Sequence, residues 1–379
     1  MARSGWVTAG AAVHFAGCGV RSAPCFRPRV ILATAAGMGA QNWASVLTTH
    51  FARCTTDGCV GSQWPCADTM MWMCLAALLG LYFLFRWYRE RETVPNLQEK
   101  YVLITGCDSG FGNQLARQLD RRGMRVLAAC LTQKEAEQLK EATSQRLQTV
   151  VLDVTDRDSV AAMAQWVKEQ VGEKGLWGLV NNAGVATPIA PNEWLTLDDF
   201  IWVINVNLIG MIDVTLSLLA LVRKARGRIV NVSSGAGRVP LIGGGYCISK
   251  FGVEAFSDSL RHDLSSFGVK VSIIEPGAFK TNMAVKAKFK ESLDRIWSQL
   301  PSEVKESYGE TSFHNYHRRF DSMLSALKAD LSPVTDSMAH GLTAVHPRAR
   351  YAAGWDAKLL YIPLSYFPTM VTDYVIAKL

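Results

Sequence analysis

Short apolar runs alternate with longer amphipathic stretches along the chain from Lys100 onward. The short runs predict buried strands, and the stretches between them have the length of helices. The predicted strands are 101–104, 125–129, 149–152, 179–180, 228–232 and 269–274, and the predicted helices include 114–122, 159–171, 200–223 and 246–267. Strands that alternate with helices are typical of βαβ units. The pattern therefore predicts an α/β fold, with a doubly wound parallel sheet covered by helices on both faces.

One apolar run differs from the others in its length and in its flanks. Residues 70–85 read MMWMCLAALLGLYFLF and carry no charge. As a helix this run reaches about 24 Å, somewhat short of the ~30 Å hydrocarbon core of a bilayer. Trp87 and Tyr88 extend it with rings suited to the interface, and Arg86, Arg89 and Arg91 lie among and after them. We predict a membrane anchor over 70–88, with the basic flank on the cytosolic side. A buried helix and the core of a signal peptide are the alternatives.

The residues before this anchor, 1–69, have an unusual composition. No acidic residue precedes Asp57, whereas five arginines do. No helical or strand period persists in this stretch. We predict an extension that is disordered or absent from the mature protein, and a mitochondrial transit peptide is the alternative.

Charge and cysteine content exclude several classes of function. The 379-residue chain has a formal charge of +7, but its lysines and arginines are scattered, which argues against a nucleic-acid partner. Six of the nine cysteines lie in the first fifth of the chain, at Cys18, Cys25, Cys54, Cys59, Cys66 and Cys74. No CxxC spacing and no cluster of cysteine with histidine is present, so we predict no metal site.

A glycine-rich loop follows the first predicted strand of the α/β region. Gly106, Gly110 and Gly112 stand between that strand and a predicted helix. Glycines let the backbone approach a pyrophosphate, and the helix N-terminus supplies free N–H groups. The spacing is Gly-x3-Gly-x-Gly. We predict a Rossmann-type dinucleotide site here.

The end of the second predicted strand bears on which dinucleotide binds. An acid there holds a ribose hydroxyl of NAD, and an arginine holds the extra phosphate of NADP. Residues 128–132 read AACLT and supply neither, while Asp108 has the wrong charge for a phosphate. NAD is therefore favoured over NADP. Asp153, at the end of the third predicted strand, is a candidate for the adenine edge or a turn residue before Ser159.

A hydroxyl, a phenol and an amine follow at suggestive spacings. Ser234 is followed by Tyr246 and, four residues later, by Lys250. A phenol has a pKa of about 10, so it needs roughly 4 kcal/mol of differential stabilisation to act as a base near pH 7. Lys250 lies on the same helical face as Tyr246 and can supply part of this. The three side chains can together move a proton on and off an alcohol.

These motifs in this order resemble the short-chain dehydrogenase/reductase family over roughly residues 98–379. The strings ITGCDSGFGN, GLWGLVNNAG, GGGYCISKFGVEAFSDSLR and GWDAKLLYIP are similar to its membrane-bound retinol and hydroxysteroid dehydrogenase branch. The resemblance implies that Tyr246 is the acid/base, that Lys250 lowers its pKa, that Ser234 binds the substrate oxygen and that Asn207 holds a water of the proton path. Ser233 and Asn205 are rivals for the last two roles. With the glycine loop and Asp153, the predicted cofactor site comprises Thr105, Gly106, Ser109, Gly110, Phe111, Gly112, Asp153, Asn181, Ala183, Gly184, Tyr246, Lys250, Pro276, Gly277 and Thr281.

The resemblance also implies an activity and a location. It implies an NAD-linked alcohol dehydrogenase that interconverts a retinol or a 3α/17β-hydroxysteroid with its carbonyl form, in the endoplasmic reticulum membrane. Residues 282–340, rich in aromatic side chains, are expected to cover the substrate. A homodimer is left open, and the apolar stretch 359–379 either contacts the bilayer or packs on the sheet. The alternatives are a mitochondrial enzyme of the 3-hydroxybutyrate dehydrogenase type and a non-catalytic cofactor-binding scaffold.

Overall fold

A seven-stranded parallel sheet forms the centre of the protein. The computed structural model describes residues 67–281 and 286–378. The strands are β1 (Tyr101–Thr105), β2 (Arg125–Cys130), β3 (Gln148–Val151), β4 (Gly178–Asn181), β5 (Arg228–Val232), β6 (Lys270–Pro276) and β7 (Arg350–Ala353). Their order in the sheet is β3-β2-β1-β4-β5-β6-β7, and every neighbouring pair is parallel. The order reverses direction beside β1, as in doubly wound dinucleotide-binding folds. The predicted fold class is confirmed.

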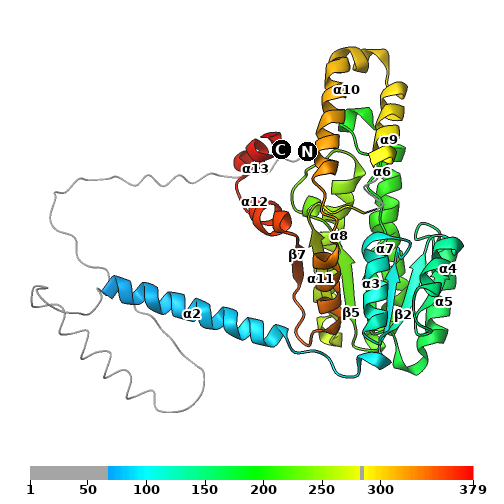
Figure 1. Ribbon diagram of the computed structural model, residues 1–379, viewed down its shortest axis with the longest axis vertical. Helices are drawn as coiled ribbons and strands as arrows, with labels where there is room; N and C mark the ends of the chain where they lie inside the picture. The colour runs from blue at the N-terminus through cyan, green and yellow to red at the C-terminus, as the bar shows by residue number, and fades with distance from the viewer. Residues whose placement is uncertain (1–66, 282–285, 379) are drawn as a thin grey trace, which may run out of the picture. The chain divides into compact units, whose positions relative to one another are not determined.

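Helices cover both faces of this sheet (Figure 1). The helices are α2 (Ala67–Glu90), α3 (Gly110–Arg121), α4 (Gln133–Glu141), α5 (Arg157–Val171), α6 (Leu197–Ile204), α7 (Gly210–Lys224), α8 (Gly245–Asp263), α9 (Lys286–Gln299), α10 (Ser302–Ser325), α11 (Ser332–Thr343), α12 (Ile362–Leu364) and α13 (Thr369–Lys378). One face of the sheet packs on α3, α4 and α11 through residues such as Leu119 and Leu342. The other face packs on α5, α7 and α8 through Met163, Leu218 and Leu260. Burial of these apolar side chains supplies the main stabilisation of the three layers.

Two elements escape the hydrophobic pattern, and one predicted helix is interrupted. Strand β7 reads RYAA and helix α4 reads QKEAEQLKE, so neither carries an apolar run that marks it in the sequence. The predicted helix 200–223 is α6 and α7 joined by a π-helical turn, Asn205–Ile209. A π turn inserts a residue into the helical repeat, and such turns recur at functional sites.

Within the described residues, two helical stretches are long and apolar enough to cross a membrane. Met70–Glu90 has a mean hydropathy of 1.6 and none of its most apolar window is buried, whereas Leu197–Lys224 has 1.8 and is 44% buried. The second stretch is α6 and α7, part of which packs on the sheet. The anchor predicted for 70–88 falls in the first stretch and stays a prediction. Most of the extension predicted over 1–69 lies outside the described residues. The chain divides into two units, Met1–Met73 and Cys74–Leu379, and the site described below belongs to the second.

Candidate active site

The motifs singled out in the sequence gather at the carboxyl ends of the strands. Thr105 ends β1, Asn181 ends β4 and Pro276 ends β6, while Ser234 follows β5. Carboxyl ends of parallel strands lie at one edge of the sheet, and ligands of such folds bind in the crevice there, at the switch in strand order. The switch here lies between β1 and β4, beside the glycine loop.

The glycine loop is held against the end of β4 by a side chain that the sequence analysis did not assign. Asn182 Nδ2 donates to the carbonyls of Thr105 (2.9 Å) and Gly106 (3.0 Å). The hydroxyl of Thr105 accepts from the backbone N–H groups of Asn182 and Ala183, both at 3.0 Å. Gly106 and Gly110 have φ of 68° and 62°, a region that favours glycine. Asn182 stood inside the NNAG string, but only the fold shows that its amide fixes the loop.

The helix that follows this loop begins without a capping side chain. Ser109, the N-cap of α3, makes no side-chain capping hydrogen bond, and the first turn of α3 carries no acid. Helices α4, α5 and α6 begin on the capping side chains of Thr132, Asp156 and Thr196. The first N–H groups of α3 therefore stay available to an anion, and the helix dipole favours one. This arrangement fits the pyrophosphate of a dinucleotide.

A second wall faces the glycine loop from the segment after β6. The rings of Phe111 and Phe279 meet edge to face with centroids 5.8 Å apart. A Cβ on Gly110 would lie 3.4 Å from the Cβ of Thr281. Gly277 packs so closely on the Asp356 carboxylate that a Cβ there would lie 2.1 Å from its oxygen. The predicted cofactor residues Phe111 and Thr281 thus lie beside the glycine loop and the segment after β6, while Gly277 packs on Asp356.

Two predicted cofactor residues use their side chains within the protein. Asn181 is buried and donates to Thr215 Oγ1 and to Asn231 Oδ1, both at 2.8 Å, so its amide braces β4 against β5 and α7. Asp153 Oδ1 accepts from the N–H (2.8 Å) and the hydroxyl (2.7 Å) of Thr155, which makes it a turn residue before α5. A role of Asp153 at the adenine edge stays a prediction.

The choice between the two serines after β5 is made by their contacts. Ser234 is half-buried and accepts from the N–H of Ala236 at 3.1 Å, and its hydroxyl lies near enough to the Tyr246 phenol to lower the pKa of that phenol. Ser233 is buried and donates to the carbonyl of Lys250 at 3.3 Å, so it points into the protein. Ser234 is therefore the hydroxyl that lies with the phenol.

The phenol and the amine lie on one face of α8, close enough to interact. Lys250 Nζ lies 5.8 Å from the centroid of the Tyr246 ring and donates to the carbonyl of Val232 at 2.9 Å. Burial lowers the pKa of Lys250 to about 8, and Glu254 opposes this shift. Burial also raises the pKa of Tyr246 above its usual value, against the hydrogen bond from Ser234. The pKa of the phenol is therefore raised by its surroundings, whereas a base near pH 7 needs a lowered pKa. The reason is that the desolvation of a phenolate outweighs the stabilisation by nearby donors.

Asn207 lies on the π turn, and its side chain is engaged on three sides. Its Oδ1 accepts from the N–H of Val185 at 2.7 Å, and its Nδ2 donates to the carbonyl of Val185 (2.8 Å) and to Ser249 Oγ (3.0 Å). The rival Asn205 is exposed. Both amide hydrogens of Asn207 are used, so a water held at this residue bonds either to the second lone pair of Oδ1 or to the backbone.

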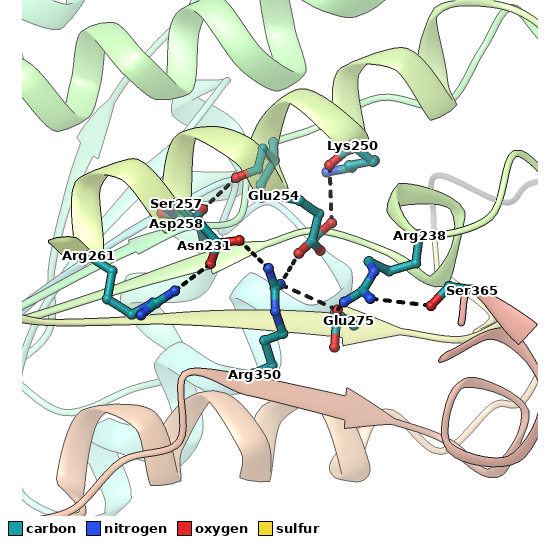
Figure 2. Close-up of polar contacts among 12 residues, drawn as sticks. Asn231, Arg238, Lys250, Glu254, Ser257, Asp258, Arg261, Glu275, Arg350 and Ser365 are labelled. Carbon is teal, nitrogen blue, oxygen red and sulfur yellow. Dashed lines mark hydrogen bonds and ion pairs between the residues drawn. The ribbon is translucent and has the colours of Figure 1, made fainter. Parts of the chain in front are cut away.

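A partly buried network of charges lies behind Lys250 and joins α8 to β6 and β7 (Figure 2). Arg350 of β7 pairs with Glu254, with Asp258 (2.5 Å) and with Glu275 (3.6 Å). Arg238 pairs with Glu275 at 3.2 Å. Burial, and then Glu275, raise the pKa of Glu254 to about 7. The hydrophobic pattern did not predict this network, because Arg350 lies on the strand that the pattern missed.

Apolar side chains surround the other side of the phenol. Tyr246 packs against a cluster formed by Ala186, Ile189, Ile242, Phe289, Phe320 and Leu324, which we call the apolar cluster. A small pocket beside the cluster is lined by Ile189, Phe289, Leu293, Phe320 and Leu324 and also by the polar side chains of Lys290, His317 and Asp321. The other aromatic residues of α9 and α10 pack elsewhere: Trp297 lies 4.9 Å from Trp194 and stacks on Phe313 at 4.8 Å. Of the aromatic residues in α9 and α10, Phe289 and Phe320 lie in the apolar cluster beside the phenol.

Comparison with known proteins agrees with this geometry. Residues 100–292 match the profile of the short chain dehydrogenase family. Rat retinol dehydrogenase 7 is 61% identical over 306 residues, which cover 81% of this chain and 96% of that protein. Human retinol dehydrogenase 16 is 63% identical over 305 residues, with 80% and 96% covered. Human 17-beta-hydroxysteroid dehydrogenase type 6 is 58% identical over 308 residues, with 81% and 97% covered.

Solved structures show the same fold. A short-chain dehydrogenase from Streptomyces avermitilis superposes with a TM-score of 0.57 at 25% identity, covering 74% of this chain and 94% of that one. A short chain dehydrogenase/reductase from Burkholderia phymatum, solved in complex with NAD, gives a TM-score of 0.57 at 23% identity, covering 70% and 92%. The family profile and the identities to these relatives agree with the strand order, the glycine loop and the Ser-Tyr-Lys side chains described above. The chain belongs to the short chain dehydrogenase family.

Proposed function

We propose that this protein is an NAD-linked oxidoreductase that interconverts a lipophilic alcohol, a retinol or a 3α/17β-hydroxysteroid, with its carbonyl form. The observation that carries the proposal is the apolar cluster that packs on Tyr246, with the Ser234 hydroxyl near the same phenol. The cluster offers an apolar substrate a contact surface beside the phenol, and Tyr246 and Ser234 offer its alcohol oxygen two hydroxyl groups. The names of the relatives, retinol and 17-beta-hydroxysteroid dehydrogenases, support this class of substrate.

Bound NAD would supply the acceptor of the hydride and a positive charge beside the phenol. Tyr246 takes the proton of the alcohol, and Ser234 holds the oxygen in place by a hydrogen bond. Because burial alone raises the pKa of Tyr246, the phenol becomes an effective base only when positive charge gathers beside it. Lys250 contributes one such charge, and the low dielectric of the site strengthens its attraction to the phenolate.

The remaining predicted residues divide between the cofactor and the proton path. Lys250 now donates to the carbonyl of Val232, and we propose that it shares its other hydrogens with the ribose of the nicotinamide. The π turn at Asn205–Ile209 is proposed to hold the water that returns protons to Lys250, through Oδ1 or the backbone of Asn207. The uncapped start of α3, with Gly106, Gly110 and Gly112, is proposed to hold the pyrophosphate.

We further propose that Met70–Glu90 anchors the protein in the endoplasmic reticulum membrane. Its apolar, unburied character supports this, as does the solubility of retinoids and steroids in lipid. Exposed apolar residues of the C-terminal segment, among them Leu359, Phe367 and Met370, are proposed to contact the same bilayer. Deletion of residues 1–88 tests which of the two segments holds the protein on the membrane. Release of the shortened protein by carbonate supports the N-terminal anchor, and unchanged retention assigns the membrane contact to the C-terminal segment.

The substrate class is tested by assaying the full chain in microsomes with NAD added. Absorbance of the reduced nicotinamide is followed with all-trans-retinol, androstanediol and 3-hydroxybutyrate. Oxidation of the retinol or of the steroid, without oxidation of 3-hydroxybutyrate, is the expected result. Oxidation of 3-hydroxybutyrate alone would assign the protein to the other branch, and binding of NAD without oxidation of any alcohol would favour a scaffold.

A further inference from the structure

A buried carboxylate lies behind the segment 277–281 after β6, which we call the wall. The carboxylate belongs to Asp356, and its Oδ2 accepts from the backbone N–H of Ala278 at 2.7 Å. A Cβ on Gly277 or on Gly354 would overlap Oδ1 of the same carboxylate, so these two glycines leave the space that it fills. Asp356 is therefore fitted against the backbone of the wall.

A lysine from a distant part of the chain completes this contact. Lys328 Nζ forms an ion pair with Asp356, and only 24% and 8% of the two side chains are exposed. The backbone of Lys328 also bonds to the wall. Its N–H donates to the carbonyl of Ala278 at 3.3 Å, and its carbonyl accepts from the N–H of Lys280 at 2.8 Å. Because Lys328 follows the end of α10, it joins the wall to the segment expected to cover the substrate.

The ring of Phe279 connects the ion pair to the glycine loop. Lys328 Nζ lies 5.2 Å from the centroid of this ring, and the ring meets Phe111 of α3 edge to face. A cation near an aromatic face is attracted by the quadrupole of the ring. The position of Lys328 thus bears on the side chain that packs at the start of α3, where the pyrophosphate is proposed to bind.

The same carboxylate precedes a turn that packs beside Ser234. The π turn Ala357–Tyr361 follows Asp356 directly. Tyr361 packs so closely on Gly235 that a Cβ there would lie 2.7 Å from Cδ2 of its ring. A shift of Asp356 would therefore act on the wall and also on the backbone next to Ser234.

The energetics of the ion pair favour a role in placing the wall. A charge-assisted hydrogen bond is roughly twice as strong as a neutral one, and it fixes two groups in distance and direction. Removing one partner of a shielded pair is costly because the other charge stays buried alone, whereas replacing both partners by apolar groups is often nearly neutral. Such a pair adds little net stability, and what it gives the wall is a fixed position.

We propose that Asp356 and Lys328 are positioning residues for hydride transfer, because their ion pair holds the wall where the nicotinamide end of the cofactor binds. The inference rests on the proposed function, in that it takes the wall to contact the cofactor. Both residues lie outside the predicted cofactor set, and they act through the backbone of the wall.

The test measures equilibrium binding of NADH to the full chain purified in detergent, by energy transfer from tryptophan to the bound nicotinamide. Asp356→Asn keeps an acceptor for the N–H of Ala278 and frees the positive charge of Lys328. If the pair positions the wall, NADH should bind about tenfold more weakly, which corresponds to ~1.4 kcal/mol. If the pair acts only through its field, the freed charge should tighten the binding of the anionic cofactor. Unchanged or tighter binding therefore overturns the proposal.

A double variant separates positioning from stability. Asp356→Asn combined with Lys328→Met keeps the net charge of the unaltered protein and leaves no shielded charge alone, so most of the Tm lost in Asp356→Asn should return. The affinity for NADH should stay low, because the ion pair is still absent. Recovery of the affinity together with the Tm would show that the pair only stabilises the fold. If Asp356→Asn does not fold, the double variant decides alone, and an unaltered affinity for NADH overturns the proposal.

The matched control is Glu137→Gln, which removes a carboxylate from α4 that hydrogen-bonds Gln133. Its affinity for NADH should equal that of the unaltered protein. If the unaltered protein does not bind NADH, the proposed function itself is contradicted. Failure of the proposed function thus shows in the unaltered protein, and failure of this inference shows only in the variants.

Discussion

The carboxyl of Glu254 offers a sharp test of how the protein keeps Lys250 charged. Glu254 lies four residues beyond Lys250 on α8 and is buried, and it raises the pKa of that amine against the effect of burial. Replacement by glutamine removes the charge and keeps the shape. Lys250 should then lose its proton at a lower pH, because a buried ammonium without a nearby carboxylate is disfavoured.

The magnitude follows from the spacing. Residues four apart on a helix stand about 6 Å apart, and two charges at that distance interact by about 2.8 kcal/mol at an effective dielectric constant of about 20, or about two pKa units. Arg350 shares the charge of Glu254, so we expect about half of this shift. The pKa of Lys250 would fall from about 8 to about 7. The ammonium form of Lys250 is lost as the pH rises, and in the variant this loss begins at a lower pH. The loss of activity in Glu254→Gln should therefore grow with pH.

The assay is kcat/KM for alcohol oxidation at saturating NAD, expressed as the ratio of Glu254→Gln to the unaltered enzyme. The ratio should be close to one at about pH 6, about one third at about pH 7.5 and about one tenth at about pH 9, following the protonated fractions for pKa values of about 7 and about 8. Glu137→Gln is the matched control and should give a ratio of one throughout. A low ratio that does not change with pH would show that Glu254 only stabilises the fold, and a ratio of one at every pH would refute the electrostatic reasoning.

Two further predictions concern the serines and the glycine loop. Ser234→Ala should lower kcat on the order of 100-fold with NADH binding retained. Ser233→Ala should instead lose about 1 kcal/mol of stability and change kcat only a few-fold. Kinetics and thermal unfolding measure both effects, and the reverse pattern would exchange the two assignments. Gly112→Ala places a Cβ 2.3 Å from the carbonyl of Gly106 and 2.5 Å from the Asn182 amide, so it should cost about 1–3 kcal/mol and weaken NADH binding in a titration. Unaltered stability and affinity would show that the loop is not fixed as described.

The hydrophobic pattern predicted six of the seven strands, including the edge strand β3, and missed β7 at the other edge. β1, β2 and β5 are recognisable because buried parallel strands read as continuous apolar runs. β7 reads RYAA and gains its place only by pairing with β6, a contact between residues distant in the chain. Helix α4 is polar on most of its surface, so its weak apolar face was missed.

In the candidate site, too, features within one helix could be predicted from the sequence, and contacts between residues distant in the chain could not. Tyr246 and Lys250 lie on one helix, and their spacing of four places them on one face whatever the fold. Asn182 and Asp356 act through contacts with segments distant in the chain, and nothing local to either residue reveals that contact. The upward shift of the Tyr246 pKa could not be predicted either, because burial is a property of the whole fold.

The central claim is that Tyr246 takes the proton of the alcohol while NAD is reduced. Its most direct test is Tyr246→Phe, which removes the phenolic hydroxyl and keeps the ring that packs on the apolar cluster. Formation of reduced nicotinamide from retinol or androstanediol is measured beside equilibrium binding of NADH. The account predicts that the variant binds NADH as the unaltered protein does and loses activity on the order of 100-fold or more. Retention of more than a few per cent of the activity would contradict it.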